Sequence, residues 1–236
     1  MIDIIVQKDV SFKNPIVIEG FPGVGLVGHI AATYLVNELE VPEIGYIRTD
    51  MLPQISMVFG GKVLPPVRIY GNEGLIVFVS DLAFPDNKTF YMADSLGSFM
   101  KDLGVSMSIS LAGIGSNSPS GAVYGVGSND EMLQTLKDNN VEVLPMGSIS
   151  GGSGALLLEC YRQSIPSLAL LAETYGNRPD PRSASDLLDI IGRLIDRKIN
   201  TESLIKEAEQ LEATLAELSK DVEKQSKSED FSTMYI

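Results

Sequence analysis

The most enzyme-like feature of the chain is a glycine-rich segment at residues 23–28. Gly23, Gly25 and Gly28 have the G-x-G-x-x-G spacing, which lets a strand–helix turn bring its backbone N–H groups against a dinucleotide pyrophosphate. Asp50 lies 22 residues after Gly28, where such a site has an acid for the ribose. Because the segment holds no Lys or Arg, only backbone N–H groups and the helix dipole would bind phosphate. The alternative is a tight strand–helix connection in which glycines permit close packing.

A second glycine-rich loop covers residues 147–154, and it also follows an expected strand. The two loops could therefore meet at one edge of a sheet and form a small-molecule pocket. The candidate pocket residues are Gly23, Gly25, Gly28, Ser150, Gly151 and Gly152. A Ser-His hydrolase is not favoured, since Ile149 is at the centre of GSISG and the single histidine, His29, precedes the loop. The alternative is an ordinary helix N-terminus capped by a serine.

Metal chemistry has little support in the residue types. Asp81, Asp86 and Asp94 could bind a hard cation, but their spacing matches no known motif, and solvated surface is the simpler interpretation. One cysteine and one histidine exclude a Cys/His zinc site. Cys160 lies in an apolar segment and is interpreted as a core residue, and His29 as a structural or surface residue. We therefore expect no metal, no cofactor and no catalytic residues.

Composition limits the function classes further. The 236 residues are 44% hydrophobic and 21% charged, a balance that can fill a core. Lys and Arg number 18 against 31 Asp and Glu, a net charge of −13, which argues against a nucleic-acid partner. No apolar run is long enough to span a membrane, and the first residues lack the basic region of a secretory signal. The single cysteine fits a reducing compartment, so we expect a cytoplasmic protein.

Apolar runs alternate with amphipathic segments, which predicts a three-layer α/β domain over residues 1–198 with a mostly parallel or mixed sheet. Strands are expected at 14–19, 43–48, 67–70, 75–80, 106–111, 141–146 and 167–172. Helices are expected at 29–39, 90–103, 130–136 after a cap at Asn129 or Asp130, 155–163, and 187–198 after a cap at Ser183 or Ser185.

A further helix is expected in residues 199–224. Its apolar positions are spaced 4, 3, 4, 3 and 4 apart, the a/d pattern of a heptad repeat. These positions are Leu204, Ala208, Leu211, Leu215, Leu218 and Val222. Such a narrow stripe suits a helix seam, either within the chain or between subunits, and the sequence leaves both open. Residues 225–236 are predicted to be a flexible tail.

The chain ends in Met234, Tyr235 and Ile236. A hydrophobic residue, an aromatic residue and a free carboxylate at the end of an acidic linker resemble a docking peptide. The aromatic ring would anchor in a pocket and the carboxylate would pair with a cation. The alternative is an incidental tail that folds back on the domain.

Three segments together resemble the archaeal branch of the proteasome assembly chaperone family. They are GFPGVGLVG at 20–28, SISGGSGALLLE at 148–159 and AETYGNRPDPRSASDLL at 172–188, followed by a helix that begins near 201–204. The resemblance implies a phosphorylase/hydrolase-like three-layer fold in which catalytic residues are not expected. It also implies a homo-oligomer, alone or together with a paralogue.

The resemblance further implies a partner, the α-subunits of the proteasome core particle. In that mechanism the Ile236 carboxylate pairs with a lysine in a pocket between adjacent α-subunits, and Tyr235 and Met234 pack into the same pocket. Several tails on one oligomer would raise avidity. The competing hypothesis is a nucleotide- or nucleoside-binding protein or enzyme that uses the two glycine loops.

Overall fold

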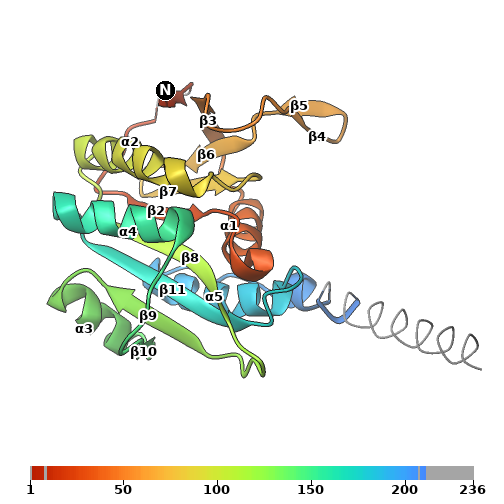
Figure 1. Ribbon diagram of the computed structural model, residues 1–236, viewed down its shortest axis with the longest axis vertical. Helices are drawn as coiled ribbons and strands as arrows, with labels where there is room; N and C mark the ends of the chain where they lie inside the picture. Colours follow the sequence, from red (N-terminus) through yellow and green to blue (C-terminus); the bar gives the residue numbers. More distant parts are fainter. Residues whose placement is uncertain (1, 8–9, 207, 211–236) are drawn as a thin grey trace, which may run out of the picture.

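The computed structural model describes residues 2–7, 10–206 and 208–210. They form three layers, a mixed sheet between two groups of helices (Figure 1). The sheet has nine strands in the order β1-β3-β6-β7-β2-β8-β11-β9-β10. Strands β7, β2, β8 and β11 run parallel to one another, whereas β1, β3, β6 and β9 join through antiparallel pairs. The predicted fold class is thus confirmed.

The strands of this sheet are β1 (Ile2–Val6), β2 (Ile16–Gly20), β3 (Glu43–Thr49), β6 (Val67–Gly71), β7 (Leu75–Ser80), β8 (Met107–Gly115), β9 (Val123–Gly127), β10 (Glu142–Val143) and β11 (Ser167–Thr174). A separate hairpin consists of β4 (Met57–Phe59) and β5 (Lys62–Leu64). The helices are α1 (Val27–Glu38), α2 (Thr89–Asp102), α3 (Asp130–Asp138), α4 (Gly151–Gln163) and α5 (Pro181–Leu194).

Each face of the sheet carries its own hydrophobic core. Helices α1, α3 and α5 bury residues such as Leu35, Leu136 and Leu187 against one face. Helices α2 and α4 bury Leu96 and Leu156 against the other face (Figure 1). The central strands are covered on both faces, which explains why they are nearly continuous apolar runs in the sequence.

The predicted strands and helices differ from the observed ones mainly where glycine or polar residues interrupt the apolar pattern. The predicted strand 141–146 shrinks to the two residues of β10. The loop predicted after residue 111 instead continues β8 to Gly115 and then contains β9. Strand β1 and the β4–β5 hairpin were not predicted, because edge strands and short hairpins lack a long apolar run.

The N-terminal cap of α5 is a second correction. The sequence pointed to Ser183 or Ser185, but the helix begins at Pro181 and its cap is Asp180. The Asp180 carboxylate accepts a hydrogen bond from the Ser183 backbone N–H at 3.1 Å. Both serines are buried inside the helix. Proline at the first helical position fits this earlier start, since its missing N–H costs nothing there.

The heptad seam is described only in its first part. Residues 202–206 and 208–210 are helical, and Leu204 and Ala208 are 1% and 2% exposed. Leu204 belongs to the same core as α1 and α5, so this position packs within the chain. The other predicted seam residues lie outside the described residues, as do Met234, Tyr235 and Ile236. Both assignments stay predictions.

Among the residues that the structure describes, no helix combines the length and the apolar character needed to cross a bilayer.

Candidate functional site

The two glycine loops meet at the carboxyl ends of β2, β8 and β11. Together they enclose a cavity of about 350 Å³. Of the candidate residues, Gly23, Ser150, Gly151 and Gly152 line this cavity, and Gly25 and Gly28 do not. A third wall comes from the last residues of β8. The strand ends of a parallel sheet are a common place for ligand binding, which makes this cavity the candidate site.

Gly25 and Gly28 serve the packing of the first loop. A Cβ atom on Gly28 would lie 2.1 Å from the Leu111 carbonyl oxygen in β8. Gly25 has a φ of +64°, and a Cβ there would lie 2.7 Å from Thr174 Oγ1. These two glycines allow the start of α1 to approach the sheet backbone closely. The packing interpretation of the motif therefore accounts for both of them.

Asp50 does not complete a dinucleotide site. It follows β3, and three interstrand steps separate β3 from β2 in the sheet order. At about 4.8 Å per step, that is a separation of about 14 Å. A dinucleotide fold places the acid-bearing strand directly beside the glycine-loop strand. The prediction that Asp50 binds a ribose beside the first loop is therefore wrong, because β7 and β6 lie between the two strands.

Glu19, which the sequence analysis missed, joins the two loops. It is the penultimate residue of β2 and its side chain is fully buried. Its Oε1 atom accepts hydrogen bonds from the Phe21 backbone N–H at 2.8 Å and from Ser153 Oγ at 3.3 Å. Phe21 belongs to the first loop and Ser153 to the first turn of α4. The signal was present as an acid inside the apolar run of residues 16–20.

The environment of Glu19 favours its neutral form. Burial raises the pKa of this carboxyl to about 7, against the opposing effect of the Phe21 N–H and of the Ser110 and Ser153 hydroxyls. Its Oε2 atom has no hydrogen-bond partner among the described residues. A buried carboxyl that titrates near neutrality can give or take a proton. Its position between Phe21 and Ser153 also ties the two loops together.

The N-terminus of α4 lacks the serine capping hydrogen bond that the sequence suggested. Ser150 occupies the cap position, but its side chain makes no capping hydrogen bond. No Lys or Arg is among the cavity-lining residues of the described chain. An anionic ligand would therefore contact backbone N–H groups and no cationic side chain. The cavity suits a small neutral molecule better than a polyphosphate.

The remaining chemistry-bearing residues lie apart from this cavity. Asp81 pairs with Arg68 through two contacts of 2.6 and 2.8 Å, and Asp94 lies 3.3 Å from Arg162. No group of three metal-ligating residues occurs in the described part of the chain. Burial lowers the pKa of His29. The buried Cys160 thiol has its pKa raised by burial to about 11.

Three segments that are distant in the sequence support the cavity edge. The Asp180 backbone N–H donates to the Gly25 carbonyl at 2.9 Å, and Thr174 Oγ1 lies 2.7 Å from Asp180 Oδ2. The first contact joins the segment 172–188 to the first loop, the second lies within that segment, and Glu19 joins the first loop to α4. The edge is thus built from the same three segments that suggested the family resemblance.

Comparison with known proteins decides the family. Residues 17–219 match the PAC2 family over most of the chain. The chain belongs to the PAC2 family. An uncharacterised protein of Methanocaldococcus jannaschii, MJ0106, is 36% identical to this PAC2 protein over 231 residues, covering 98% of this chain and 96% of the relative. The resemblance found in the sequence is thereby confirmed.

Solved structures agree with this assignment. Pyrococcus furiosus PbaA, described as an archaeal homolog of proteasome-assembly chaperone, is 35% identical with a TM-score of 0.86, covering 100% of this chain and 99% of PbaA. Pyrococcus furiosus PbaB, described as an archaeal proteasome activator, has a TM-score of 0.84 at 22% identity, covering 92% of this chain and 98% of PbaB. The likeness to PbaB shows a shared fold.

Proposed function

We propose that this PAC2 protein is a non-enzymatic chaperone or adaptor of the proteasome that docks its C-terminus on core-particle α-subunits. The observation that carries the proposal is its 35% identity over the full chain to PbaA, a homolog of a proteasome-assembly chaperone. The C-terminal sequence Met234-Tyr235-Ile236 supports the docking mode. The Ile236 carboxylate pairs with a lysine, and Tyr235 and Met234 fill the pocket between adjacent α-subunits.

Self-association adds avidity to this docking. A homo-oligomer presents several tails at once, so that after one tail binds, the next binds at a high effective concentration. Weak docking by each tail then gives stable attachment of the whole assembly. The domain fixes the positions of the tails, and the tails make the contact.

The test is a pull-down of the core particle, or of free α-subunits, with the full chain and with a chain that ends at Thr233. We expect the shortened chain to lose binding and to keep its fold and its oligomeric mass. Tyr235→Ala should weaken binding by about 2 kcal/mol or more, as expected for an aromatic anchor. Unchanged affinity after the deletion would refute the docking role.

Two controls separate docking from general loss of apolar surface. Phe231→Ala removes an aromatic ring four residues before Tyr235, and we expect it to bind like the parent chain. One glycine added after Ile236 keeps every side chain but moves the carboxylate, and we expect it to abolish binding. Loss of binding with Phe231→Ala, or full binding with the added glycine, contradicts the mechanism.

The cavity between the glycine loops supports one second function, the binding of a small neutral molecule such as a nucleoside. Its volume of about 350 Å³ and the buried Glu19 beside its wall are the supporting observations. A thermal-shift screen with nucleosides and nucleotides tests it, because a bound ligand raises the melting temperature. A response to nucleosides that Gly152→Val abolishes would support it, and a flat response across the panel would count against it.

A further inference from the structure

Glu19 is a buried acid beneath the first turn of α4. In the sheet it lies between Phe78 of β7 and Ser110 of β8, and its side chain is fully buried. Its Oε1 atom accepts the hydrogen bonds of Phe21 and Ser153, whereas its Oε2 atom has no partner in the described chain. An ionised carboxylate with one unsatisfied oxygen is costly away from water, so this position favours the neutral acid.

The interface between α4 and the sheet has few apolar contacts. Only one of the four buried side chains of α4, Leu156, is large and apolar, whereas α5 buries four such side chains. Three buried serines of the sheet lie against Glu19 or Cys160, namely Ser108, Ser110 and Ser167. Glu159 and Gln163 pack closely around Gly97 of α2, which anchors the second half of α4. Because segments with few buried apolar contacts open at the lowest free-energy cost, the first turn is the part of α4 that opens most easily.

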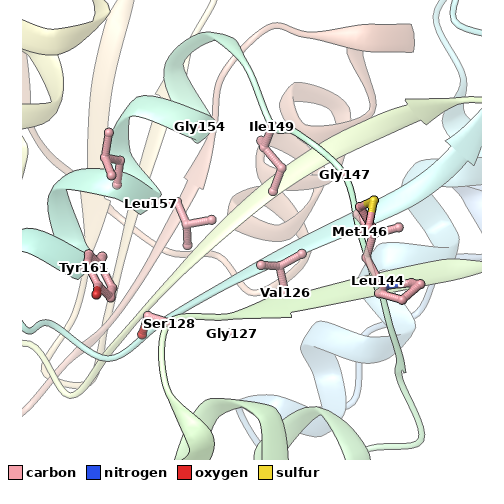
Figure 2. A pocket seen from close by; sticks show the side chains of 12 residues that line it. Val126, Gly127, Ser128, Leu144, Met146, Gly147, Ile149, Gly154, Leu157 and Tyr161 are labelled. Atoms are coloured by element: carbon pink, nitrogen blue, oxygen red, sulfur yellow. The ribbon is translucent and has the colours of Figure 1, made fainter.

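The segment that leads into α4, residues 144–150, is a strap between two hollows. Four of its residues line both the cavity at the glycine loops and a groove of about 520 Å³ between α4 and β9, namely Leu144, Met146, Gly147 and Ile149 (Figure 2). The Leu144 N–H donates to the Gly125 carbonyl, but in the described chain no backbone–backbone hydrogen bond outside the helices and strands involves residues 145–149. With space on both sides, the strap can move together with the start of α4.

The other ionisable groups near Glu19 keep their charge state around neutral pH. From α4 the Cys160 thiol faces it, and burial raises the pKa of this thiol to about 11. Further along α4, the hydrogen bonds of Arg162 hold the pKa of the Glu159 carboxyl below its ordinary value. The buried side chains of α2 carry no ionisable group, and the sheet neighbours are Phe78 and Ser110. In this part of the described chain, Glu19 is therefore the group that changes charge near pH 7.

Burial and the bond to Ser153 act on Glu19 in opposite directions. The Ser153 hydroxyl favours the ionised form, whereas burial disfavours it. Burial prevails, because it raises the pKa from 4.5 to about 7. Water that reaches Oε2 removes this penalty, and the cavity provides a route for it, since Ser153 is part of the cavity wall. Ionisation of Glu19 and opening of the first turn of α4 therefore favour each other.

We infer that Glu19 is a pH-sensitive latch, which in its neutral form keeps the first turn of α4 closed over β2 and in its ionised form releases that turn together with the strap. The released state opens the cavity at the glycine loops to solvent. The inference concerns the regulation of the site proposed above for a small neutral molecule. The latch itself needs no ligand, so a flat ligand screen leaves it standing.

The test is backbone hydrogen exchange of the full chain at pH 6 and pH 8, corrected for the pH dependence of intrinsic exchange. The N–H groups of residues 155–157 bond back to the first turn of α4, so their exchange measures its opening. With a pKa of about 7 in the closed state and 4.5 in the open state, the opening equilibrium should be about tenfold larger at pH 8. Low urea should not change this exchange, because a local opening exposes little surface, whereas exchange in the middle of α5 should rise with urea.

Two variants identify the group responsible. Glu19→Gln keeps the shape of the side chain but cannot ionise, so residues 155–157 should exchange with the same opening equilibrium at both pH values. Asp186→Asn is the matched control, because burial raises the pKa of this α5 carboxyl as well, to about 6. Asp186 packs on the opposite face of the sheet from α4, so its variant should keep the tenfold change.

The inference is overturned if residues 155–157 open equally at pH 6 and pH 8, if Glu19→Gln keeps the tenfold change, or if Asp186→Asn abolishes it. It is also overturned if exchange at residues 155–157 rises with urea as it does in α5, because the whole domain then unfolds. The chain ending at Thr233 should show the same pH dependence as the full chain. Failure of the latch and failure of proteasome docking are therefore separate results.

Discussion

The two glycine loops look alike in the sequence, but Gly28 of the first and Gly151 of the second are glycines for different reasons. In the first loop, a Cβ on Gly28 would lie 2.1 Å from the Leu111 carbonyl oxygen, so the space is filled by backbone. In the second loop, Gly151 has nothing within 4 Å of its Cβ position but has a φ of +71°. Gly28 is therefore needed for close packing and Gly151 for its backbone conformation. Each loop also contains the other kind of glycine, since Gly25 has a φ of +64° and a Cβ on Gly154 would lie 2.1 Å from the Ile149 carbonyl oxygen.

This difference shows that glycine spacing alone does not identify a binding loop. The pattern at Gly23, Gly25 and Gly28 matches a dinucleotide motif, yet two of its three glycines contact the protein itself. The second loop matches no motif, yet most of its residues line the cavity. The wall that is open to a ligand is therefore the one with the weaker sequence signal.

The strongest test of the difference between the glycines of the two loops is Gly28→Ala. The new methyl group would overlap the β8 backbone, which cannot move aside as a flexible side chain can, and we expect a loss of about 3 kcal/mol in unfolding free energy. Urea denaturation measures it. Gly23→Ala is the control, since its Cβ would meet nothing within 4 Å and its φ of −154° is extended. Equal losses in the two variants would show that the first loop is not packed as described.

Glu19→Gln tests the contact that joins the loops. The folded-state pKa of Glu19 is about 7, above its ordinary value of 4.5. Because the pKa is raised in the folded state, the contribution of Glu19 to stability is fully present below pH 4.5. This contribution is lost as the pH rises through 7. The variant should therefore gain about 2 kcal/mol relative to the parent chain between pH 5.5 and pH 8. Unfolding curves at the two pH values measure this gain.

Glu159→Gln should change the pH dependence of stability in the opposite direction. Its carboxylate accepts hydrogen bonds from Arg162, which lower its pKa. Removal of that charge should destabilise the chain at pH 8, and less so as the pH falls through the lowered pKa. If the two glutamine variants shift stability in parallel with pH, the electrostatic contrast between these glutamates is wrong.

Gly151→Ala tests the conformational role of the second loop. With no steric contact, the cost should come from the left-handed backbone alone, about 1 kcal/mol. Gly151→Asn should cost less, because asparagine tolerates this conformation better. Thermal unfolding of the two variants measures the difference. A loss as large as that of Gly28→Ala would remove the distinction between Gly28 and Gly151.

The smallest expected effect is at the cap of α4. Ser150 makes no capping hydrogen bond, so Ser150→Ala should change stability by less than about 0.5 kcal/mol. Asn129, which accepts from the Met132 N–H at 2.9 Å, caps α3, and Asn129→Ala should cost about 1 kcal/mol. Urea unfolding of both variants checks this. A similar cost at the two positions would mean that Ser150 caps α4 after all.

The apolar pattern and three short segments were enough to predict the fold class and the family. Apolar runs such as residues 75–80 and 167–172 correspond to the buried strands β7 and β11, because burial on both faces requires continuous apolar residues. The segments 20–28, 148–159 and 172–188 carried the family resemblance. The C-terminal Met234, Tyr235 and Ile236 were also read from the sequence alone, and their docking role stays a prediction.

Which residues share a site became visible only in the folded chain. Strand order is set by long-range pairing, so the separation of Asp50 from the first loop and the joining of both loops through Glu19 could not be derived from local patterns. The same holds for exposed apolar side chains. Phe59 and Met146 are ordinary apolar residues in the sequence, and only the packed fold shows that they are 80% and 90% exposed.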